Sequence, residues 1–223
     1  MDKPGESHMS HSEGKSTAGN SRTDRTRVAY DRISRIYDLM ELRAERALFR
    51  HWRQRLFEMV EGRVLEVGVG TGKNIPHYST GSSVFAIDLS ARMMGYARRR
   101  ARQAVVRPKL ILMDAQHLGF REHTFDTIVA TFVYCSVPDP VAGFEELNRV
   151  CKPDGRILLL EHVRSTGRIK GWLMDVLNPL VVKLMGFNIN RDTVRNVKLA
   201  LSVTGVDHLK GELFKRIRAR PRA

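Results

Sequence analysis

The sequence has few cysteines, no long hydrophobic run and a shortage of acidic side chains. Two cysteines, Cys135 and Cys151, are too few for a disulfide framework or a cysteine-built zinc site, and they indicate a reduced, intracellular compartment. No window reaches about 18 uninterrupted apolar residues, which excludes a polytopic membrane protein. The first 27 residues hold no apolar stretch of the signal-peptide type. What is left is a globular chain of 223 residues, 42% apolar and 28% charged.

Acidic residues are outnumbered, with 24 Asp and Glu against 38 Lys and Arg and a net charge of +14. Residues 92–109 carry seven basic side chains and no acid, and the chain from residue 210 onward carries six basic residues and one acid. The excess charge therefore lies on the folded part of the chain. Three interpretations stay open at this point: a solvated basic face, a nucleic-acid surface, and a surface for anionic lipid headgroups.

The N-terminal region divides into a tail and a helical segment. Residues 1–27 are rich in Ser, Gly, Thr and His with almost nothing to bury, which predicts a disordered leader before a single domain at 28–223. From Tyr30 to Met59 the apolar residues recur at helical spacing, and Gly62 ends the run. The pattern predicts N-terminal helices over 28–61.

Short apolar runs alternate with helical patterns through the middle of the chain. Strands are predicted just before Gly68 and at 84–90, 109–115, 127–131 and 156–163, helices at 91–103 and 141–150, and a turn at 152–155. Ser90 is placed to cap the first of these helices. The alternation predicts an α/β fold with a doubly wound, mostly parallel sheet. Residues 165–195 are apolar but interrupted by Pro179 and by charges. They predict an insertion after the fifth strand, over the carboxyl edge of the sheet, before two late strands.

The strongest local motif is a glycine-rich stretch directly after the first strand, Glu66-Val67-Gly68-Val69-Gly70-Thr71-Gly72. Glycines at such a strand end let the backbone approach a ligand closely, and the helix that follows favours negative charge. A dinucleotide fingerprint would need glycine at position 73, where Lys73 stands. A nucleotide phosphate site is therefore off pattern, and a tight turn without a ligand is the alternative.

Two aspartates end the next two strands. Asp88 is placed to accept both hydroxyls of a ribose, a role shared by NAD and S-adenosylmethionine sites. Asp114 lies between the apolar Met113 and Ala115, which suits the amine and the apolar face of adenine. Either aspartate alone could be an ordinary strand-end or capping residue. Together with Glu66, they put acids at the ends of three successive strands, which favours a nucleoside-binding site.

Five segments combine into one pattern: EVGVGTG, AIDLSARMM, LMDAQHLGF, FDTIVATFVYCSVPDP and RVCKPDGRILLLEH. Over residues 30–161 they resemble a class I S-adenosylmethionine-dependent methyltransferase. The resemblance implies a Rossmann-like fold, S-adenosylmethionine as the cofactor, and a loop of Gly68, Gly70 and Gly72 around its methionine part. The full implied cofactor-binding set is Glu66, Gly68, Gly70, Thr71, Gly72, Asp88, Leu89, Met93, Asp114 and Ala115.

Within that superfamily, the chain is most similar to the group containing quinone C-methyltransferases and bacterial phosphatidylethanolamine N-methyltransferases. The opening Tyr30-Asp31…Tyr37-Asp38 resembles the N-terminal helix that folds over the cofactor in this group. The segments EVGVGTGKNIPHY and TFVYCSVPDP look closer to the phospholipid enzymes than to the quinone enzymes.

Methyl transfer to an ammonium requires that the nitrogen first lose a proton, so side chains near the strand ends that can accept one are candidates. The catalytic candidates are His162, Tyr30, Tyr37 and Tyr134. The alternatives are a strand-end histidine bonded to a loop, and tyrosines that pack a helix against the sheet. Arg191 follows the apolar insertion and suits a phosphate headgroup, or it is a solvated arginine at a helix start. No metal-ligand spacing such as H-E-x-x-H is present in the sequence, so no metal is predicted.

These features predict a methyltransferase that acts on the amine of a phosphatidylethanolamine-type phospholipid. We expect an amphiphilic or lipid acceptor, an anionic membrane surface as partner, and a cytoplasmic enzyme peripheral to the inner membrane face. C- or O-methylation of a quinone or another small apolar acceptor is the alternative. A nucleic-acid-binding or -methylating protein is the third hypothesis. The N/D-P-P-[YFW] pattern of base-amine methylation and the common nucleic-acid-binding motifs are absent from the sequence, which disfavours nucleic acid as a partner.

Overall fold

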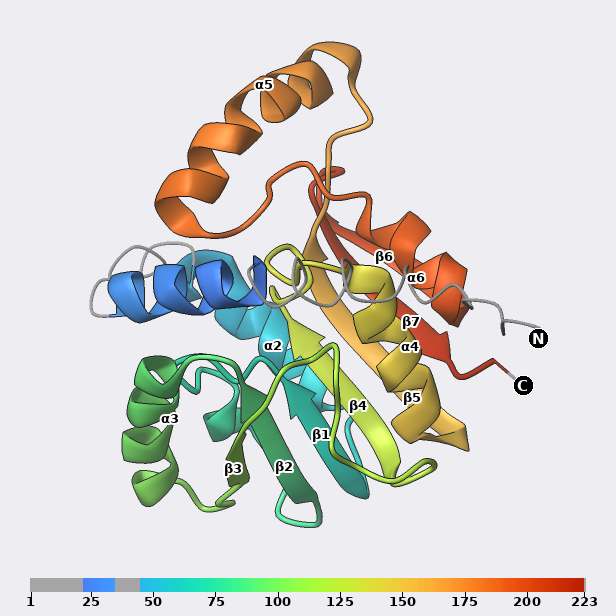
Figure 1. Ribbon diagram of the computed structural model, residues 1–223. Coiled ribbons are helices and arrows are strands. Elements are labelled where there is room, and N and C mark those ends of the chain that lie inside the picture. The colour runs from blue at the N-terminus through green and yellow to red at the C-terminus, as the bar shows by residue number, and fades with distance from the viewer. Residues whose placement is uncertain (1–21, 35–44, 223) are drawn as a thin grey trace, which may run out of the picture.

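A seven-stranded sheet forms the centre of the computed structural model, which describes residues 22–34 and 45–222 (Figure 1). The strands are β1 (Arg63–Val67), β2 (Ser83–Asp88), β3 (Lys109–Leu112), β4 (Phe125–Thr131), β5 (Cys151–His162), β6 (Ser202–Lys210) and β7 (Phe214–Arg220). They lie in the order β3-β2-β1-β4-β5-β7-β6. Strands β1 to β5 run parallel, whereas β7 is antiparallel to both β5 and β6. The chain reverses its direction of winding between β1 and β4, which is where such a sheet binds its ligand.

Helices flank both faces of the sheet. They are a helix over 22–34, η1 (Glu45–Phe49), α2 (Arg50–Phe57), η2 (Ile75–His77), α3 (Ala91–Gln103), α4 (Pro140–Val150), α5 (Arg168–Met185) and α6 (Thr193–Ala200). α3 begins where Ser90 Oγ accepts the backbone N–H of Met93 at 3.1 Å. α4 begins where Asp139 Oδ1 accepts the N–H groups of Val141 and Ala142. These caps satisfy backbone donors that the first helical turn leaves unpaired.

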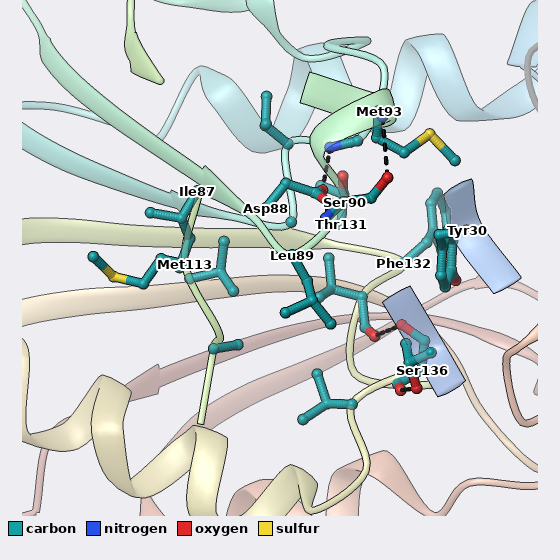
Figure 2. Close-up of a pocket in the computed structure, with 18 of the residues that line it drawn as sticks. Tyr30, Ile87, Asp88, Leu89, Ser90, Met93, Met113, Thr131, Phe132 and Ser136 are labelled. Carbon is teal, nitrogen blue, oxygen red and sulfur yellow. Dashed lines mark hydrogen bonds between the residues drawn. The ribbon is translucent and has the colours of Figure 1, made fainter. Parts of the chain in front are cut away.

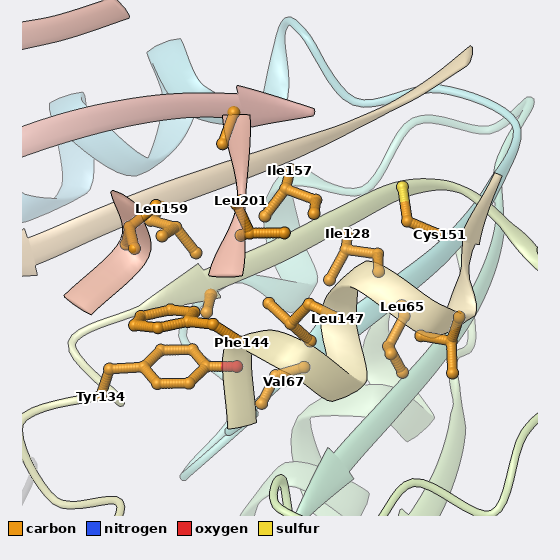
Figure 3. Packing of buried hydrophobic residues seen from close by; sticks show 14 of the residues in the cluster. Leu65, Val67, Ile128, Tyr134, Phe144, Leu147, Cys151, Ile157, Leu159 and Leu201 are labelled. Carbon is orange, nitrogen blue, oxygen red and sulfur yellow. The ribbon is translucent and has the colours of Figure 1, made fainter. Parts of the chain in front are cut away.

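Alternating side chains of β1 contribute to the two sides of the hydrophobic core, because successive residues of a strand point to opposite faces. Leu65 and Val67 belong to one buried cluster together with Leu147 of α4 (Figure 3). Val64 belongs to the other, together with Leu56 of α2. Packing on both faces explains why the parallel strands read as nearly continuous apolar runs.

The predicted architecture is confirmed: the sheet is doubly wound and mostly parallel, the helix predicted at 91–103 is α3, and the two late strands are β6 and β7. The predicted turn at 152–155 falls within the bounds of β5, but these residues have no partners in the β4–β5 register, which passes from Phe125–Cys151 to Thr127–Arg156. A Cβ atom on Gly155 would lie 2.9 Å from the carbonyl oxygen of Lys152, so the chain folds back on itself at the predicted place.

The predicted leader, residues 1–27, is wrong at its end. Residues 22–27 are the start of the helix over 22–34, because Thr23 and Thr26 find hydrogen-bond partners in the folded domain. Residues 1–21 lie outside the described residues. So do 35–44, which include Tyr37 and the middle of the N-terminal helices predicted at 28–61.

α5 lies within the predicted insertion 165–195 and stands apart from the helices that cover the sheet (Figure 1). It projects from the carboxyl edge of the strands and runs through Pro179. It ends at Gly186, whose φ of +80° is the left-handed conformation that glycine adopts without strain. Within the described part of the chain, no helix is both long and apolar enough to cross a bilayer.

Candidate active site

A cavity opens at the carboxyl ends of β1, β2, β3 and β4 (Figure 2). We call it the cofactor cavity, because it gathers most of the residues predicted to bind the cofactor. The predicted residues that line it are Gly68, Gly70, Thr71, Asp88, Leu89, Met93, Asp114 and Ala115. They come from the ends of three separate strands, β1, β2 and β3, so the parallel sheet brings together what the sequence keeps apart.

The glycine loop forms one wall of the cofactor cavity, and two of its glycines have distinct roles. Gly68 has a φ of +69°, and a Cβ atom there would lie 2.4 Å from the Val133 side chain. Gly70 has a φ of +54°, and a Cβ atom there would have no neighbour within 4 Å. The first glycine therefore lets two loops touch, and the second leaves open space for a ligand.

Asp88 is held rigidly at the end of β2. Its Oδ2 atom accepts the backbone N–H of Gly70 at 2.8 Å, and its Oδ1 atom accepts that of Ser90 at 2.8 Å. Burial raises the pKa of Asp88 above its usual range, while these backbone hydrogen bonds oppose the shift. Leu89 and Met93 line the cavity beside it (Figure 2). An oriented carboxylate next to an apolar wall suits a nucleoside, because each oxygen keeps a lone pair for a hydroxyl group.

Asp114 and Ala115 form the part of the wall that follows β3. Asp114 Oδ1 accepts the backbone N–H of Gln116 at 2.9 Å, and its carboxylate also accepts the side-chain amide of Gln116. The side chain of Asp114 is 23% exposed, so it keeps access to the cavity.

Glu66 and Gly72, the other two predicted cofactor residues, are not among those that line the cavity. Glu66 is fully buried and accepts hydrogen bonds from Asn74 Nδ2 at 2.7 Å and from the Tyr78 hydroxyl. Burial raises the pKa of Glu66 above its usual range. A Cβ atom on Gly72 would lie 2.7 Å from Ile75 Cδ1. Glu66 therefore stabilises the glycine loop from the side away from the cavity, and Gly72 permits close packing against Ile75.

Arg53 is a cavity residue that the sequence analysis missed. It is only 4% exposed, and its Nη1 atom donates to Asn74 Oδ1 at 2.8 Å and to Thr131 Oγ1 at 2.6 Å. Its guanidinium group lies 5.3 Å from the ring centroid of Phe132. The sequence feature that could have indicated its burial is its position between Trp52 and the other buried residues of the α2 face. With Arg27 and Lys73, Arg53 gives the cavity lining three cations beside the two acids Asp88 and Asp114.

Glu161 belongs to the segment RVCKPDGRILLLEH, and the sequence alone predicts no role for it. It is fully buried at the end of β5, and its Oε1 atom accepts the backbone N–H groups of Val133 and Tyr134 at 3.0 and 3.1 Å. Burial raises the pKa of Glu161 to about 8. Glu161 thus fixes the loop after β4, where Phe132 adopts a φ of +59°.

The helix over 22–34 crosses the cofactor cavity on the side away from the sheet, and its first half contacts the loops after β3 and β4. Thr23 Oγ1 donates to Asp114 Oδ2 at 3.4 Å, and Thr26 Oγ1 donates to the carbonyl oxygen of Ser136 at 3.3 Å. Thr26 also lines the cavity.

The second half of the same helix is joined to two other helices. Asp31 Oδ1 accepts the hydroxyl of Ser90 at 2.5 Å, next to the start of α3. Arg32 Nη2 donates to the carbonyl oxygen of Leu184 at 2.9 Å, near the end of α5. The helix therefore links the cofactor cavity to α5.

A second cavity, the apolar cavity, adjoins the first and shares Tyr30 and Phe132 with it. Its complete lining is Tyr30, Phe49, Phe132, Cys135, His162, Met185, Phe187, Asn188, Ile189 and Phe214. The ring of His162 meets that of Phe214 edge-on, with centroids 5.3 Å apart. Burial lowers the pKa of His162 below its usual range, so the imidazole is neutral at pH 7. Two of the predicted catalytic residues, Tyr30 and His162, thus meet in this cavity.

A third cavity, the basic cavity, lies between the helix over 22–34, the end of α5 and the loop before α6. Its charged lining residues are Arg22, Asp24, Arg25, Arg32, Lys183 and Arg191. Arg191 Nη2 donates to the carbonyl oxygen of Val137 at 3.0 Å, whereas its Nε is buried and has no hydrogen-bond partner in the described part of the chain. Burial lowers the pKa of Arg191. The predicted headgroup residue therefore lies in a cavity with five cations and one acid.

Tyr134, a predicted catalytic residue, is not among the residues that line the three cavities. It is 1% exposed, its ring stacks on Phe144 with centroids 3.9 Å apart, and its hydroxyl has no hydrogen-bond partner among the described residues (Figure 3). The tyrosine follows β4 in sequence, but its side chain turns into the core beneath the loop. Tyr37 lies outside the described residues.

Residues 65–159 match the family model described as a methyltransferase domain. A phosphatidylethanolamine N-methyltransferase from Cereibacter sphaeroides is 43% identical over 103 residues, which are 45% of this chain and 51% of that protein. The chain thus matches about half the length of that relative. A demethylmenaquinone methyltransferase from Thermobifida fusca is 30% identical over 169 residues, which cover 71% of this chain and 72% of that protein.

The chain belongs to the class I S-adenosylmethionine-dependent methyltransferases. A solved methyltransferase structure from Thermotoga maritima has the same fold, with a TM-score of 0.66, 19% identity, and coverage of 87% of this chain and 99% of that one. The cofactor cavity of this methyltransferase fits S-adenosylmethionine, the cofactor of the family. The fit rests on the open space beside Gly70 and on the oriented carboxylate of Asp88 at the cavity wall.

Proposed function

We propose that this methyltransferase methylates the amine of a phosphatidylethanolamine-type phospholipid at a membrane surface. One observation carries the proposal: an apolar cavity and a basic cavity both border the cofactor cavity. A phospholipid amine is joined through a phosphate to acyl chains, and therefore needs one anion-binding and one apolar environment near the reacting nitrogen. The 43% identity to a phosphatidylethanolamine N-methyltransferase supports the same acceptor.

Each part of the cofactor has residues in the cofactor cavity that suit it. Asp88 would accept the ribose hydroxyls, and Leu89 and Met93 would flank the adenine, whose amine would meet Asp114. The methionine part would lie along Gly68 and Gly70, with Arg53 available for its carboxylate; bound there, S-adenosylmethionine supplies an electrophilic methyl group.

The acceptor would meet the cofactor where the two cavities share Tyr30 and Phe132. An ammonium has no lone pair to attack with, so its proton must leave first. His162 can accept that proton on a ring nitrogen, because burial lowers its pKa and keeps the imidazole neutral. The lone pair of the neutral amine would then be free to accept the methyl group that bound S-adenosylmethionine supplies. Arg191 would bind the phosphate, since its buried Nε has no hydrogen-bond partner within residues 22–34 and 45–222.

Methylation of a quinone is the second candidate function. The 30% identity to a demethylmenaquinone methyltransferase favours it, as do the aromatic rings of Phe49, Phe132 and Phe214 in the apolar cavity. Such an acceptor carries no phosphate, so this function leaves the basic cavity without a role.

Incubation with methyl-labelled S-adenosylmethionine distinguishes these acceptors. The pools are vesicles with phosphatidylethanolamine, vesicles with phosphatidylcholine only, a demethylated quinone, and RNA. We expect label in the phosphatidylethanolamine vesicles and none in phosphatidylcholine, whose nitrogen already carries three methyl groups. Label confined to the quinone would establish the second candidate, and label confined to RNA would overturn both.

A further inference from the structure

α5 carries an unusual row of exposed apolar side chains. Ile169, Trp172, Leu173, Val176, Leu177, Leu180 and Leu184 are between 42% and 81% exposed. They recur at spacings of three and four residues, which places them along one face of the helix. Isolated exposed apolar residues are normal on a protein surface, but a contiguous stripe of seven marks an interaction surface. We call these seven residues the α5 stripe.

The opposite face of α5 is anchored to the domain, so the stripe is held in a fixed orientation. Gly171 is buried, and a Cβ atom there would lie 2.7 Å from the carbonyl oxygen of Ser165. Asn178 Oδ1 accepts the backbone N–H of Ile189 at 2.9 Å, and its Nδ2 donates to Asn188 Oδ1 at 3.0 Å. The side that carries polar partners faces the domain, and the apolar side faces outward.

The charges on α5 favour an anionic partner. The helix contains Arg168, Lys170 and Lys183, and its one acid, Asp175, is paired with Arg164 at 2.7 Å. A basic helix with a large apolar face is the pattern of helices that lie in the interface of an anionic membrane. Trp172, which is 62% exposed within the stripe, is a side-chain type enriched at that interface.

The position of α5 favours a bilayer, rather than another protein, as the partner of the α5 stripe. Met185, in the last turn of α5, lines the apolar cavity, and Val182 and Lys183 line the basic cavity. A membrane bound along the stripe would therefore lie next to both cavities in which we place the acceptor. The helix of 18 residues is about 27 Å long at about 1.5 Å per residue, which suits an orientation parallel to the membrane plane.

We propose that the α5 stripe docks this enzyme on the surface of a bilayer containing anionic lipid. This inference deepens the proposed function, and it rests on that function for the identity of the acceptor delivered there. The stripe enters the boundary between headgroups and acyl chains, and the flanking cations contact anionic headgroups. α5 would then supply the contact with the anionic membrane surface that the sequence predicts.

A matched pair of double variants tests the proposal. Val176→Glu with Leu180→Glu disrupts the stripe, whereas Val105→Glu with Leu199→Glu changes two exposed apolar side chains elsewhere. Both add the same negative charge at exposed positions, since Val176 and Leu180 are 55% and 56% exposed and Val105 and Leu199 are 89% and 56% exposed. The measurement is co-sedimentation with phosphatidylcholine vesicles containing phosphatidylglycerol. We expect the stripe variant to lose at least about tenfold in partition and the control less than about twofold.

Fluorescence locates the contact directly. Trp172 should be quenched by vesicles whose acyl chains carry bromine, and Trp172→Phe should remove that quenching while Trp52, at 9% exposed, is unaffected. Equal vesicle partition of the two double variants, or no quenching of Trp172, overturns the proposal. So does a wild-type dimer in sedimentation velocity that becomes monomeric in the stripe variant with unchanged vesicle binding, because the stripe then covers a second copy of the chain.

The two proposals fail separately. If the stripe variant loses vesicle binding but the wild type labels only RNA or quinone, docking stands and the phospholipid function is wrong. If both double variants bind vesicles and methylate phosphatidylethanolamine alike, the function stands and docking by α5 is wrong.

Discussion

The cofactor cavity and the two cavities that border it are built from different kinds of structure. The cofactor cavity is made largely of turns that follow β1 to β4 directly, and backbone N–H groups orient its acids, as Gly70 and Ser90 do for Asp88. The apolar and basic cavities are made mostly of segments added around the sheet, namely the helix over 22–34, η1, α5 and the loop after α5, and the apolar cavity also takes Phe132, His162 and Phe214 from the sheet and its loops. Turns of the sheet thus dominate the first region, and added segments contribute most of the second.

This difference separates what the enzyme binds in common with its family from what sets its acceptor. Chains that share the sheet can keep the cofactor cavity and change the acceptor by altering the additions, because binding residues vary on segments that a common scaffold positions. Mutations should therefore split into two classes, affecting either cofactor affinity or acceptor turnover.

The largest effect is expected at His162, on the acceptor side. His162→Gln should lower kcat about 10²–10⁴-fold on phosphatidylethanolamine, because it removes the imidazole that accepts the ammonium proton in the apolar cavity. Burial lowers the His162 pKa below its usual value, so wild-type activity should hold at neutral pH and fall as the pH drops through that lowered pKa. The variant should lose this acid limb, and cofactor affinity should not change.

His77→Gln is the matched control for this variant. Burial also lowers the His77 pKa, but His77 contacts Phe57 and is not among the residues that line the three cavities. If the two variants have the same kcat and the same pH profile, His162 accepts no proton in the reaction.

The next largest effect concerns the cofactor side. Asp88→Ala should weaken S-adenosylmethionine binding by about 1–3 kcal/mol, because hydrogen bonds to a charged group are lost. Isothermal titration calorimetry measures this, with Asp126→Ala as the control at the opposite end of the sheet, where Asp126 pairs with Lys152. An unchanged affinity in a folded Asp88→Ala protein would mean that the cofactor binds elsewhere.

Arg191 should give a smaller effect confined to phospholipid acceptors. Arg191→Gln should raise KM for phosphatidylethanolamine about tenfold with kcat nearly unchanged, since it removes binding equally from ground and transition states. Turnover of a quinone acceptor, which has no phosphate, should not change. Arg195→Gln, on the exposed surface of α6, is the control. A fall in kcat with both acceptors would instead assign Arg191 a structural role through its bond to Val137.

The smallest effect is expected for Tyr134, which belongs to neither side of the comparison. Tyr134→Phe removes a buried hydroxyl without a partner, so the free energy of unfolding should stay the same or rise by up to about 1 kcal/mol. Urea unfolding and steady-state kinetics measure the two quantities. A large loss of kcat at unchanged stability would return Tyr134 to the list of catalytic candidates.

Local rules made the sheet and the cofactor cavity predictable from the sequence. A serine that can cap α3 and acids that end successive strands are short-range features, and Ser90, Asp88 and Asp114 all lie where the pattern places them. The strand ends then meet because parallel strands share an edge.

Long-range packing decided what the sequence could not show. In the sequence, Arg53 follows an apolar residue of a helix, and its side chain is expected to be exposed beside the apolar face. The packing of α2 instead turns this side chain into the cofactor cavity. Tyr134 reads as a site residue because it follows β4, yet its ring turns into the core. Thr23 and Thr26 lack the hydrophobicity that signals order, and their partners are about 90 to 110 residues away.

The helix over 22–34 has a consequence for the rate at which the enzyme exchanges its cofactor. Its hydrogen bonds through Thr23, Thr26 and Asp31 contribute only about 0.5–1.5 kcal/mol each, and all three lie on one rigid segment. They should therefore break together, in a single opening event on the microsecond-to-millisecond timescale. Because Arg32 of the same helix is bonded to the end of α5, the opening frequency would differ between an enzyme resting on lipid and one free in solution. The rate at which the demethylated cofactor dissociates would then depend on whether the enzyme is bound to the membrane that contains the acceptor.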